Sequence, residues 1–76
     1  MFTAKELRDL MNKQPFQPFR VVMSNGDKFE VPNHDAALVG KNWVEVGTNL
    51  DAEGFPLSVA RCAMLHIAQI EDLQPA

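Results

Sequence analysis

Residues 19–31 read Phe-Arg-Val-Val-Met-Ser-Asn-Gly-Asp-Lys-Phe-Glu-Val and are the most clearly patterned segment of the chain. Apolar and polar side chains alternate on either side of Asn25-Gly26, as they do on strands with one buried face. An Asn-Gly pair is a strong hairpin signal, because a type I′ turn needs a positive φ at both central residues. The segment therefore predicts antiparallel strands over 19–24 and 27–31, joined by a type I′ turn. The side chains expected on the inner face are those of Phe19, Val21, Met23, Phe29 and Val31.

Upstream of the hairpin, Thr3-Ala4-Lys5-Glu6 is a capping box, in which the threonine hydroxyl and the glutamate carboxylate each accept a backbone N–H. Leu7, Leu10 and Met11 follow at the spacing of one helical face. These signals predict a helix over residues 4–13 that Pro15 ends. The connector 14–19, Gln-Pro-Phe-Gln-Pro-Phe, is stiffened by two prolines, and we expect its two rings to close the end of a sheet.

Downstream of the hairpin, turns and short apolar runs alternate. Pro32–Asp35 and 40–42 are rich in turn-forming residues, and the segment 36–39 between them fits either a helical turn or an extended piece. Alternating side chains predict strands over 43–46 and 57–61, with Val44 and Val46 pointing inward. Glycine, asparagine and aspartate are frequent in 47–56, which predicts an exposed loop.

Residues 62–71 are ambiguous between helix and strand. Ser58 can cap a helix, and alanine, methionine and leucine favour one, so a C-terminal helix over 58–70 is the alternative. The apolar positions leave no clean polar face, so we favour a tight turn near 62–65 followed by a fifth strand over 66–71.

These elements predict a mainly β protein. The expected architecture is an N-terminal helix followed by a five-stranded small barrel of the Sm-like or SH3-like kind over 19–71, since five curled strands can close on one core. At 76 residues we expect a single domain, 1–76, and an apolar share of 46% argues against disorder.

The stretch Val-Val-Met-Ser-Asn-Gly-Asp-Lys-Phe-Glu-Val over 21–31, with Asp35 shortly after it, resembles the Sm-like family, including the bacterial host-factor type of RNA chaperone. This resemblance implies a ring-forming barrel that binds RNA. Where that family has a glycine in its second strand and a later Arg-Gly pair, this chain has Glu30-Val31 and Arg61-Cys62.

A second resemblance is to a set of short bacterial proteins of unassigned activity. They share a capped first helix, a Gln-Pro-Phe-x-Pro-Phe connector, an Asn-Gly or Asp-Gly hairpin and a C-terminal His-Ile-x-x-Ile-Glu. Residues 14–19, 25–26 and 66–71 fit that pattern. Where those proteins often have His-Pro-Glu, this chain has Asn33-His34-Asp35.

Charge and cysteine content narrow the classes of function. Seven Lys and Arg against ten Asp and Glu give a net charge of −3. Residues 42–76 carry most of that negative charge, which argues against a general binder of nucleic-acid backbones. No apolar run suits a secretory signal or a membrane span. The lone Cys62 excludes an internal disulfide, and we expect a cytoplasmic protein without membrane partners.

Only His34-Asp35 and the pair of Cys62 and His66 offer catalytic or ligand chemistry. A structural zinc site needs four donors, and on a strand the latter two would lie about 13 Å apart. We therefore expect no catalytic residue, no metal, no cofactor and no small-molecule substrate, and a small enzyme is the last alternative.

We expect a non-enzymatic interaction module that self-associates, because open strand edges invite pairing into a dimer or a ring. The alternative is an Sm-like RNA-binding protein. In either case the candidate contact residues are Arg20, Lys28, His34, Lys41, Trp43 and Arg61. RNA binding would need the four cations on one face, with the tryptophan available for stacking.

Overall fold

The computed structural model describes residues 2–73 and is mainly β with one N-terminal helix. The elements are α1 (Ala4–Met11), β1 (Phe19–Met23), β2 (Lys28–Val31), β3 (Ala37–Val39), β4 (Trp43–Leu50), β5 (Pro56–Ala63), the 3₁₀ turn η1 (Met64–His66) and β6 (Ile67–Asp72). The two ends of the expected domain, residues 1 and 74–76, lie outside the described residues.

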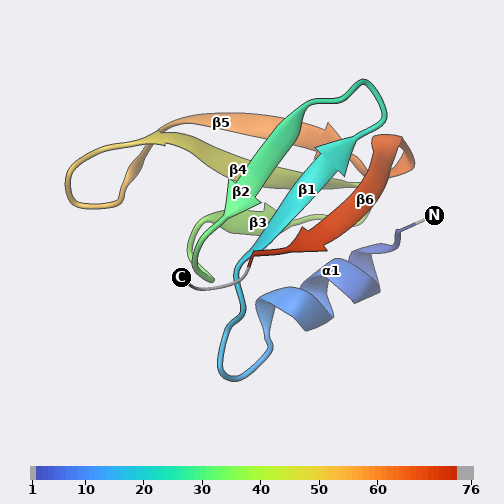
Figure 1. The fold of residues 1–76 in the computed structure, drawn as a ribbon, viewed down its shortest axis with the longest axis horizontal. Helices are drawn as coiled ribbons and strands as arrows, with labels where there is room; N and C mark the ends of the chain where they lie inside the picture. Colours follow the sequence, from blue (N-terminus) through green and yellow to red (C-terminus); the bar gives the residue numbers. More distant parts are fainter. Residues whose placement is uncertain (1, 74–76) are drawn as a thin grey trace.

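The strands form two antiparallel sheets of three, in the orders β2-β1-β6 and β3-β4-β5 (Figure 1). Residues 36–39, for which the sequence fits either a helical turn or an extended piece, contain the strand β3. It follows a turn over Asn33–Asp35 and brings the number of strands to six, one more than predicted. No strand pairing joins the two sheets within residues 2–73, so the five-stranded barrel is not confirmed. Pro32 lacks an N–H and directly follows β2, so β2 and β3 are separate short strands.

The hairpin at Asn25-Gly26 forms, but its turn type differs from the prediction. Gly26 donates its N–H to Met23 O at 2.9 Å and has a φ of 95°, whereas Asn25 has no positive φ. This is a three-residue loop in which a type I turn is followed by a left-handed glycine. The Asn25 side chain accepts the N–H of Asp27 at 2.9 Å, which favours this loop over the type I′ turn.

The predicted loop over 47–56 is wrong at both ends. β4 continues to Leu50 and β5 begins at Pro56, so the loop is only residues 51–55. Cross-strand pairing outweighs the turn-forming composition here, since Thr48 lies opposite Ser58 and their hydroxyls bond at 2.6 Å. Asn49, with a φ of 51°, has no partner in this register, which resumes with Leu50 opposite Pro56.

The C-terminal turn and strand are confirmed, and the alternative helix over 58–70 is wrong. β6 pairs with β1, with Val21 opposite Ile70, and so extends the first sheet. η1 carries the chain from the edge of one sheet to the edge of the other, and Met64 and Ile67 anchor the turn because they are buried.

α1 is two residues shorter than predicted at its C-terminus, where Asn12 caps it well before Pro15. At the N-terminus Thr3 Oγ1 accepts the N–H of Glu6 at 3.2 Å, as expected. The glutamate does not reach back to the backbone, because its carboxylate instead accepts the Thr3 hydroxyl at 3.2 Å. After the helix, the rings of Phe16 and Phe19 pack at a tilt, 6.1 Å between centroids.

The core lies between the two sheets and α1. Each sheet contributes alternate side chains, so one continuous cluster joins the elements. Its buried members are Leu7, Phe19, Val21, Val31, Ala36, Val44, Val46, Cys62, Met64 and Ile67. In the described part of the chain, no helix has the length and apolarity needed to cross a membrane.

Candidate interaction surface

β5 is an edge strand with a free side. Met64 donates its N–H to Asn42 O at 2.9 Å, and β4 and β5 are antiparallel. Bonded pairs alternate along such a ladder, so Cys62, Ala60 and Ser58 bond to β4. The N–H and C=O groups of Leu57, Val59 and Arg61 therefore point away from β4, and no other strand among residues 2–73 pairs with them.

The far halves of β4 and β5 form a projecting arm, which we define as residues 48–58 (Figure 1). Apolar side chains are exposed on this arm and next to it. Their exposed fractions are 40% for Leu50, 65% for Phe55, 73% for Leu57 and 54% for Val59. Large apolar side chains gathered on one projecting element mark an interaction surface more strongly than scattered ones do.

The tip of the arm is held by one carboxylate. Asp51 Oδ1 accepts the N–H groups of both Glu53 and Phe55 at 2.9 Å. Asp51 N also donates to Phe55 O at 2.8 Å, and the N–H of Gly54 to Asp51 O at 3.0 Å. Phe55 is thus presented to solvent from an ordered loop, so less conformational entropy is lost when a partner covers it.

The outer face of the β3-β4-β5 sheet continues this apolar surface. Leu38, 65% exposed, and Val59 border a shallow hollow of about 370 Å³. Glu45 lies opposite Leu38, and its carboxylate is 3.8 Å from the guanidinium of Arg61. His34 and Asp35 form another part of the rim.

Trp43 and Arg61 form one unit on this sheet. The guanidinium carbon of Arg61 lies 5.0 Å from the tryptophan ring centroid, a cation–π contact. Gly40 backs the ring so closely that an added Cβ would come within 2.7 Å of it. The half-buried ring thus contacts both Arg61 and Gly40, which leaves less of it for stacking on another group.

The six sequence-predicted contact residues do not form one face. Arg20 and Lys28 project from the β2-β1-β6 sheet, whereas Trp43 and Arg61 lie on the other sheet. The other two predicted contact residues, His34 and Lys41, are exposed in the turns before β3 and β4.

Arg20 is engaged by two carboxylates. Its guanidinium lies 2.8 Å from Glu30 and 3.1 Å from Glu71, which stand opposite it on the neighbouring strands. Hydrogen bonds to Glu30 and then Glu71 raise the pKa of the Arg20 guanidinium. This charge is therefore compensated within the sheet and is poorly placed to hold a phosphate.

The residues with catalytic or ligand chemistry are dispersed. His34 Nε2 is 3.6 Å from Asp35 Oδ1 in an exposed turn. Cys62 is buried in the core, and burial, with the charge of Asp27 second, raises the pKa of its thiol. Between residues 2 and 73, no three His, Cys, Asp or Glu side chains gather as a metal site would require.

Sequence reasoning missed the arm. Leu50 and Phe55 lie in the segment that was expected to be a loop, and Leu57 and Val59 were read only as strand residues. The available signal was three large apolar side chains within 50–57, which is unusual in an exposed loop. No protein-family model, curated protein or solved structure matches this chain.

Proposed function

We propose that this protein is an interaction module that self-associates through the free edge of β5. The observation that carries the proposal is an eight-residue edge strand with outward-pointing backbone groups and exposed Leu57 and Val59 beside them. Unpaired N–H and C=O groups in a row are a template for another strand. Burying the two side chains would add the apolar contribution that backbone pairing alone lacks.

β5 lacks the devices that usually protect an edge. Arg61 is its one charged residue, and Pro56 stands at its first position, where it leaves the rest of the edge open. In contrast, the outer face of the β2-β1-β6 sheet carries charged side chains on all three strands, with Arg20 of β1 opposite Glu30 of β2 and Glu71 of β6. The β5 edge is therefore the better-suited surface for a second copy.

Two closed assemblies fit such an edge. Pairing of β5 with β5 of a second copy gives a two-fold dimer, whereas pairing of β5 with β6 of the next copy gives a ring. β6 ends in Asp72, whose charge is opposite to that of Arg61, and this complementarity favours the ring.

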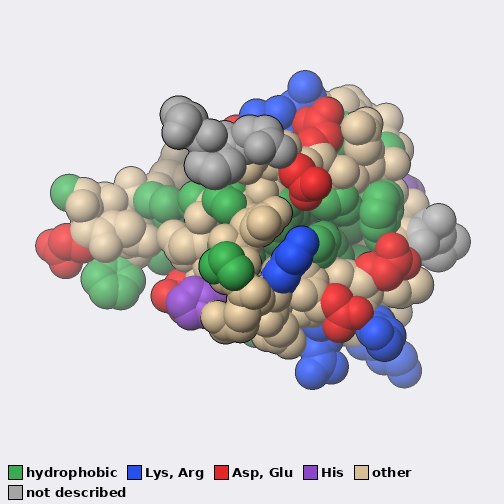
Figure 2. All heavy atoms as spheres, turned by 60° about the horizontal axis from the view of Figure 1, so that its bottom comes forward, with side chains coloured by type: hydrophobic (Ala, Val, Ile, Leu, Met, Phe, Trp, Pro, Cys, Tyr) green, Lys and Arg blue, Asp and Glu red, His purple; other side chains and the backbone are tan. Residues whose placement is uncertain are grey.

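We also propose that the fold is related in topology to the Sm-like and SH3-like small barrels. The pairing of β6 with β1, and the 3₁₀ turn between β5 and β6, support an Sm-like or SH3-like topology with an open seam. RNA binding stays a prediction without a supporting observation, because the cations are divided between the two sheets. The face shown in Figure 2 likewise mixes acidic and basic side chains. Neither does any described contact favour an enzyme.

The test is the molar mass in solution of the wild type and of Val59→Pro. The Val59 N–H points to the free edge, so proline removes an intermolecular donor and leaves the β4 ladder complete. We expect the wild type to be oligomeric at micromolar concentration and the variant monomeric. A wild type that is strictly monomeric by light scattering would exclude the proposal.

Two further variants complete the design. Val59→Lys should also give monomers, which guards against a folding defect peculiar to proline. Asp72→Pro removes an N–H from the free edge of β6, and it should leave a β5–β5 dimer intact but break a β5–β6 ring. Circular dichroism of each variant shows whether the fold is retained.

A further inference from the structure

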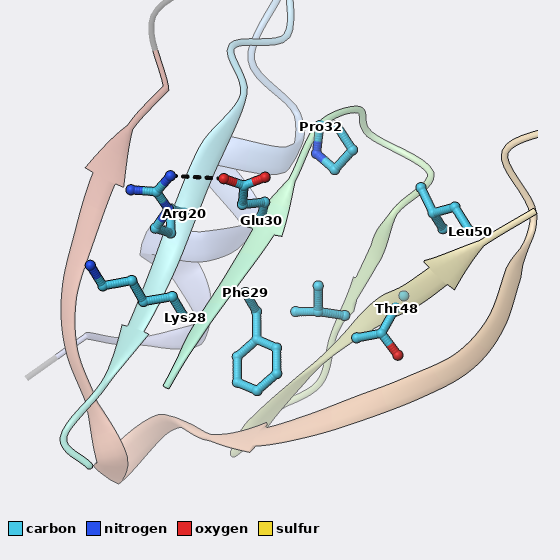
Figure 3. Close-up of a pocket in the computed structure, with 9 residues that line it drawn as sticks. Arg20, Lys28, Phe29, Glu30, Pro32, Thr48 and Leu50 are labelled. Atoms are coloured by element: carbon cyan, nitrogen blue, oxygen red, sulfur yellow. Dashed lines mark hydrogen bonds and ion pairs between the residues drawn. The ribbon is translucent and has the colours of Figure 1, made fainter. Parts of the chain in front are cut away.

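A groove of about 560 Å³ runs along the seam where the two sheets fail to join (Figure 3). One wall is β2 with Pro32, and the other is the far half of β4. Figure 3 shows Phe29 directed into the gap, with Thr48 and Leu50 on the opposite wall. We call this the seam groove; it is lined by Arg20, Lys28, Phe29, Glu30, Pro32, Val46, Gly47, Thr48 and Leu50.

The wall formed by β2 is a strand edge with which no other strand among residues 2–73 pairs. Met23 donates its N–H to Asp27 O at 2.7 Å, and this bonded pair sets the alternation along β1 and β2. Phe29 and Val31 therefore bond to β1, while the N–H and C=O groups of Lys28 and Glu30 point to the free side. That side is the one occupied by the seam groove.

The groove has an apolar interior and one uncompensated charge. Phe29 is half-buried, and Pro32 and Leu50, which are both exposed, add apolar surface. Arg20 is occupied by Glu30 and Glu71, but Lys28 is exposed and forms no ion pair with any residue in 2–73. An occupant with an acidic group beside Lys28 would meet an attractive potential.

We propose that the seam groove binds an extended peptide segment of a partner protein, which adds to β2 as a fourth strand. The backbone of the peptide exchanges hydrogen bonds with Lys28 and Glu30. Alternate apolar side chains of the peptide enter the groove against Phe29 and Leu50, and an acidic side chain in between lies beside Lys28. Such strand addition takes affinity from the main chain and specificity from alternate side chains.

The shape of the groove favours an extended chain over a compact ligand. Its lining follows consecutive residues on both walls, Lys28–Glu30 on β2 and Val46–Thr48 on β4. It is an open trough beside a strand edge, whereas compact ligands are held in enclosed cavities. The proposed occupant pairs with the β2 edge, and the groove includes neither Leu57 nor Val59, so this inference does not depend on self-association.

The experiment is a nuclear magnetic resonance titration of the full chain with two blocked heptapeptides. In one peptide valine alternates with aspartate, and in the other valine alternates with lysine. We expect saturable shifts at the amides of Lys28, Phe29 and Glu30 and at Thr48 with the aspartate peptide. The lysine peptide should bind at least about threefold more weakly, because it replaces one exposed attractive pair, Lys28 with an aspartate, by a repulsive pair of lysines.

Lys28→Glu and Lys41→Glu are a matched pair of variants, because both lysines are exposed and only the first lines the groove. Lys28→Glu should weaken the aspartate peptide about three- to tenfold and reverse the preference between the two peptides. Lys41→Glu should leave both affinities unchanged. An aspartate peptide with N-methyl groups on alternate amides tests the main-chain bonds, since one of the two methylation registers should abolish binding.

Four outcomes would overturn the proposal. Three concern the wild type: the absence of saturable shifts at Lys28–Glu30 with millimolar peptide, equal affinity for the two peptides, and shifts confined to Leu57–Arg61. The last of these would mean that peptides add to β5 instead. Equal loss of affinity in Lys28→Glu and Lys41→Glu would likewise contradict the proposal, because the preference for the aspartate peptide would then depend on the net charge of the protein and not on contact with Lys28.

Discussion

At the scale of single residues, Gly40 and Gly26 are required for different physical reasons. Gly40 is a glycine because the Trp43 ring lies against it, and three ring atoms would be within 2.9 Å of an added Cβ. Gly26 is required for a different reason, its φ of 95°. The sequence marks both as turn residues, and only the packing separates their roles.

Gly40→Ala is expected to destabilise the protein by about 1–3 kcal/mol, because the tryptophan ring must move to admit a methyl group. The chain has one tryptophan, so its fluorescence reports both the ring's environment and unfolding. We expect a shifted emission maximum and a lower denaturant midpoint. Lys41→Ala, at the exposed neighbouring position, should change stability by less than about 0.5 kcal/mol.

The thiol of Cys62 should make stability depend on alkaline pH. Burial raises its pKa in the folded state, while the unfolded thiol titrates near its ordinary value of about 8.5. The contribution is fully present at pH 7. As the pH rises past 8.5, the unfolded state loses this proton first, and the free energy of unfolding falls.

The measurement compares denaturant unfolding of wild type and Cys62→Ala between pH 7 and 10. The wild type should lose stability relative to the variant, by no more than about 1.4 kcal/mol per pH unit. Parallel curves would show that the thiol is not shielded. In agreement with burial, a thiol reagent should modify native Cys62 far more slowly than the unfolded chain.

At the scale of elements, local signals located each unit but not its full length. The capping residue, the Asn-Gly loop and the turn near residues 62–65 depend on neighbours a few positions away, and all three form. The arm was missed because its extent depends on pairing between two strands, which overrides the loop composition of 47–56.

α1 is expected to depend on one leucine for docking. Leu7 is the only fully buried residue described on the helix, at 1% exposed, and an eight-residue helix is unstable alone. Leu7→Ala should cost about 2–4 kcal/mol through the cavity it leaves, measured by denaturant unfolding. Leu65→Ala is the matched control, since Leu65 is 71% exposed and should cost little.

At the scale of the whole molecule, two small sheets share one core. Val21 and Val31 from the first sheet pack in the same cluster as Val44 and Val46 from the second, and β6 returns to pair with β1. Each sheet must bury its apolar face against another layer, which here is the other sheet with α1, so neither sheet is expected to persist without the other.

This shared core predicts a single cooperative unfolding transition. Tryptophan fluorescence follows the environment of Trp43 on the β3-β4-β5 sheet, while far-ultraviolet circular dichroism reports the backbone of α1 and of the strands in both sheets. The two denaturation curves should coincide. Curves with separate midpoints would show that the open seam divides the protein into independently unfolding parts.

The elements themselves can be predicted from the chain because each depends on contacts within a few residues: the cap at Thr3, the alternation on both sides of Gly26, and the inward Val44 and Val46. The sequence does not predict whether the sheets close, how far the arm extends, or where the two proposed binding surfaces lie. They follow from pairings between distant segments, such as Arg20 with Glu71, 51 positions apart. Alternation of apolar and polar side chains shows which face of a strand is buried. It carries no information about which edge of the strand remains unpaired, because every strand has the same backbone groups along both edges.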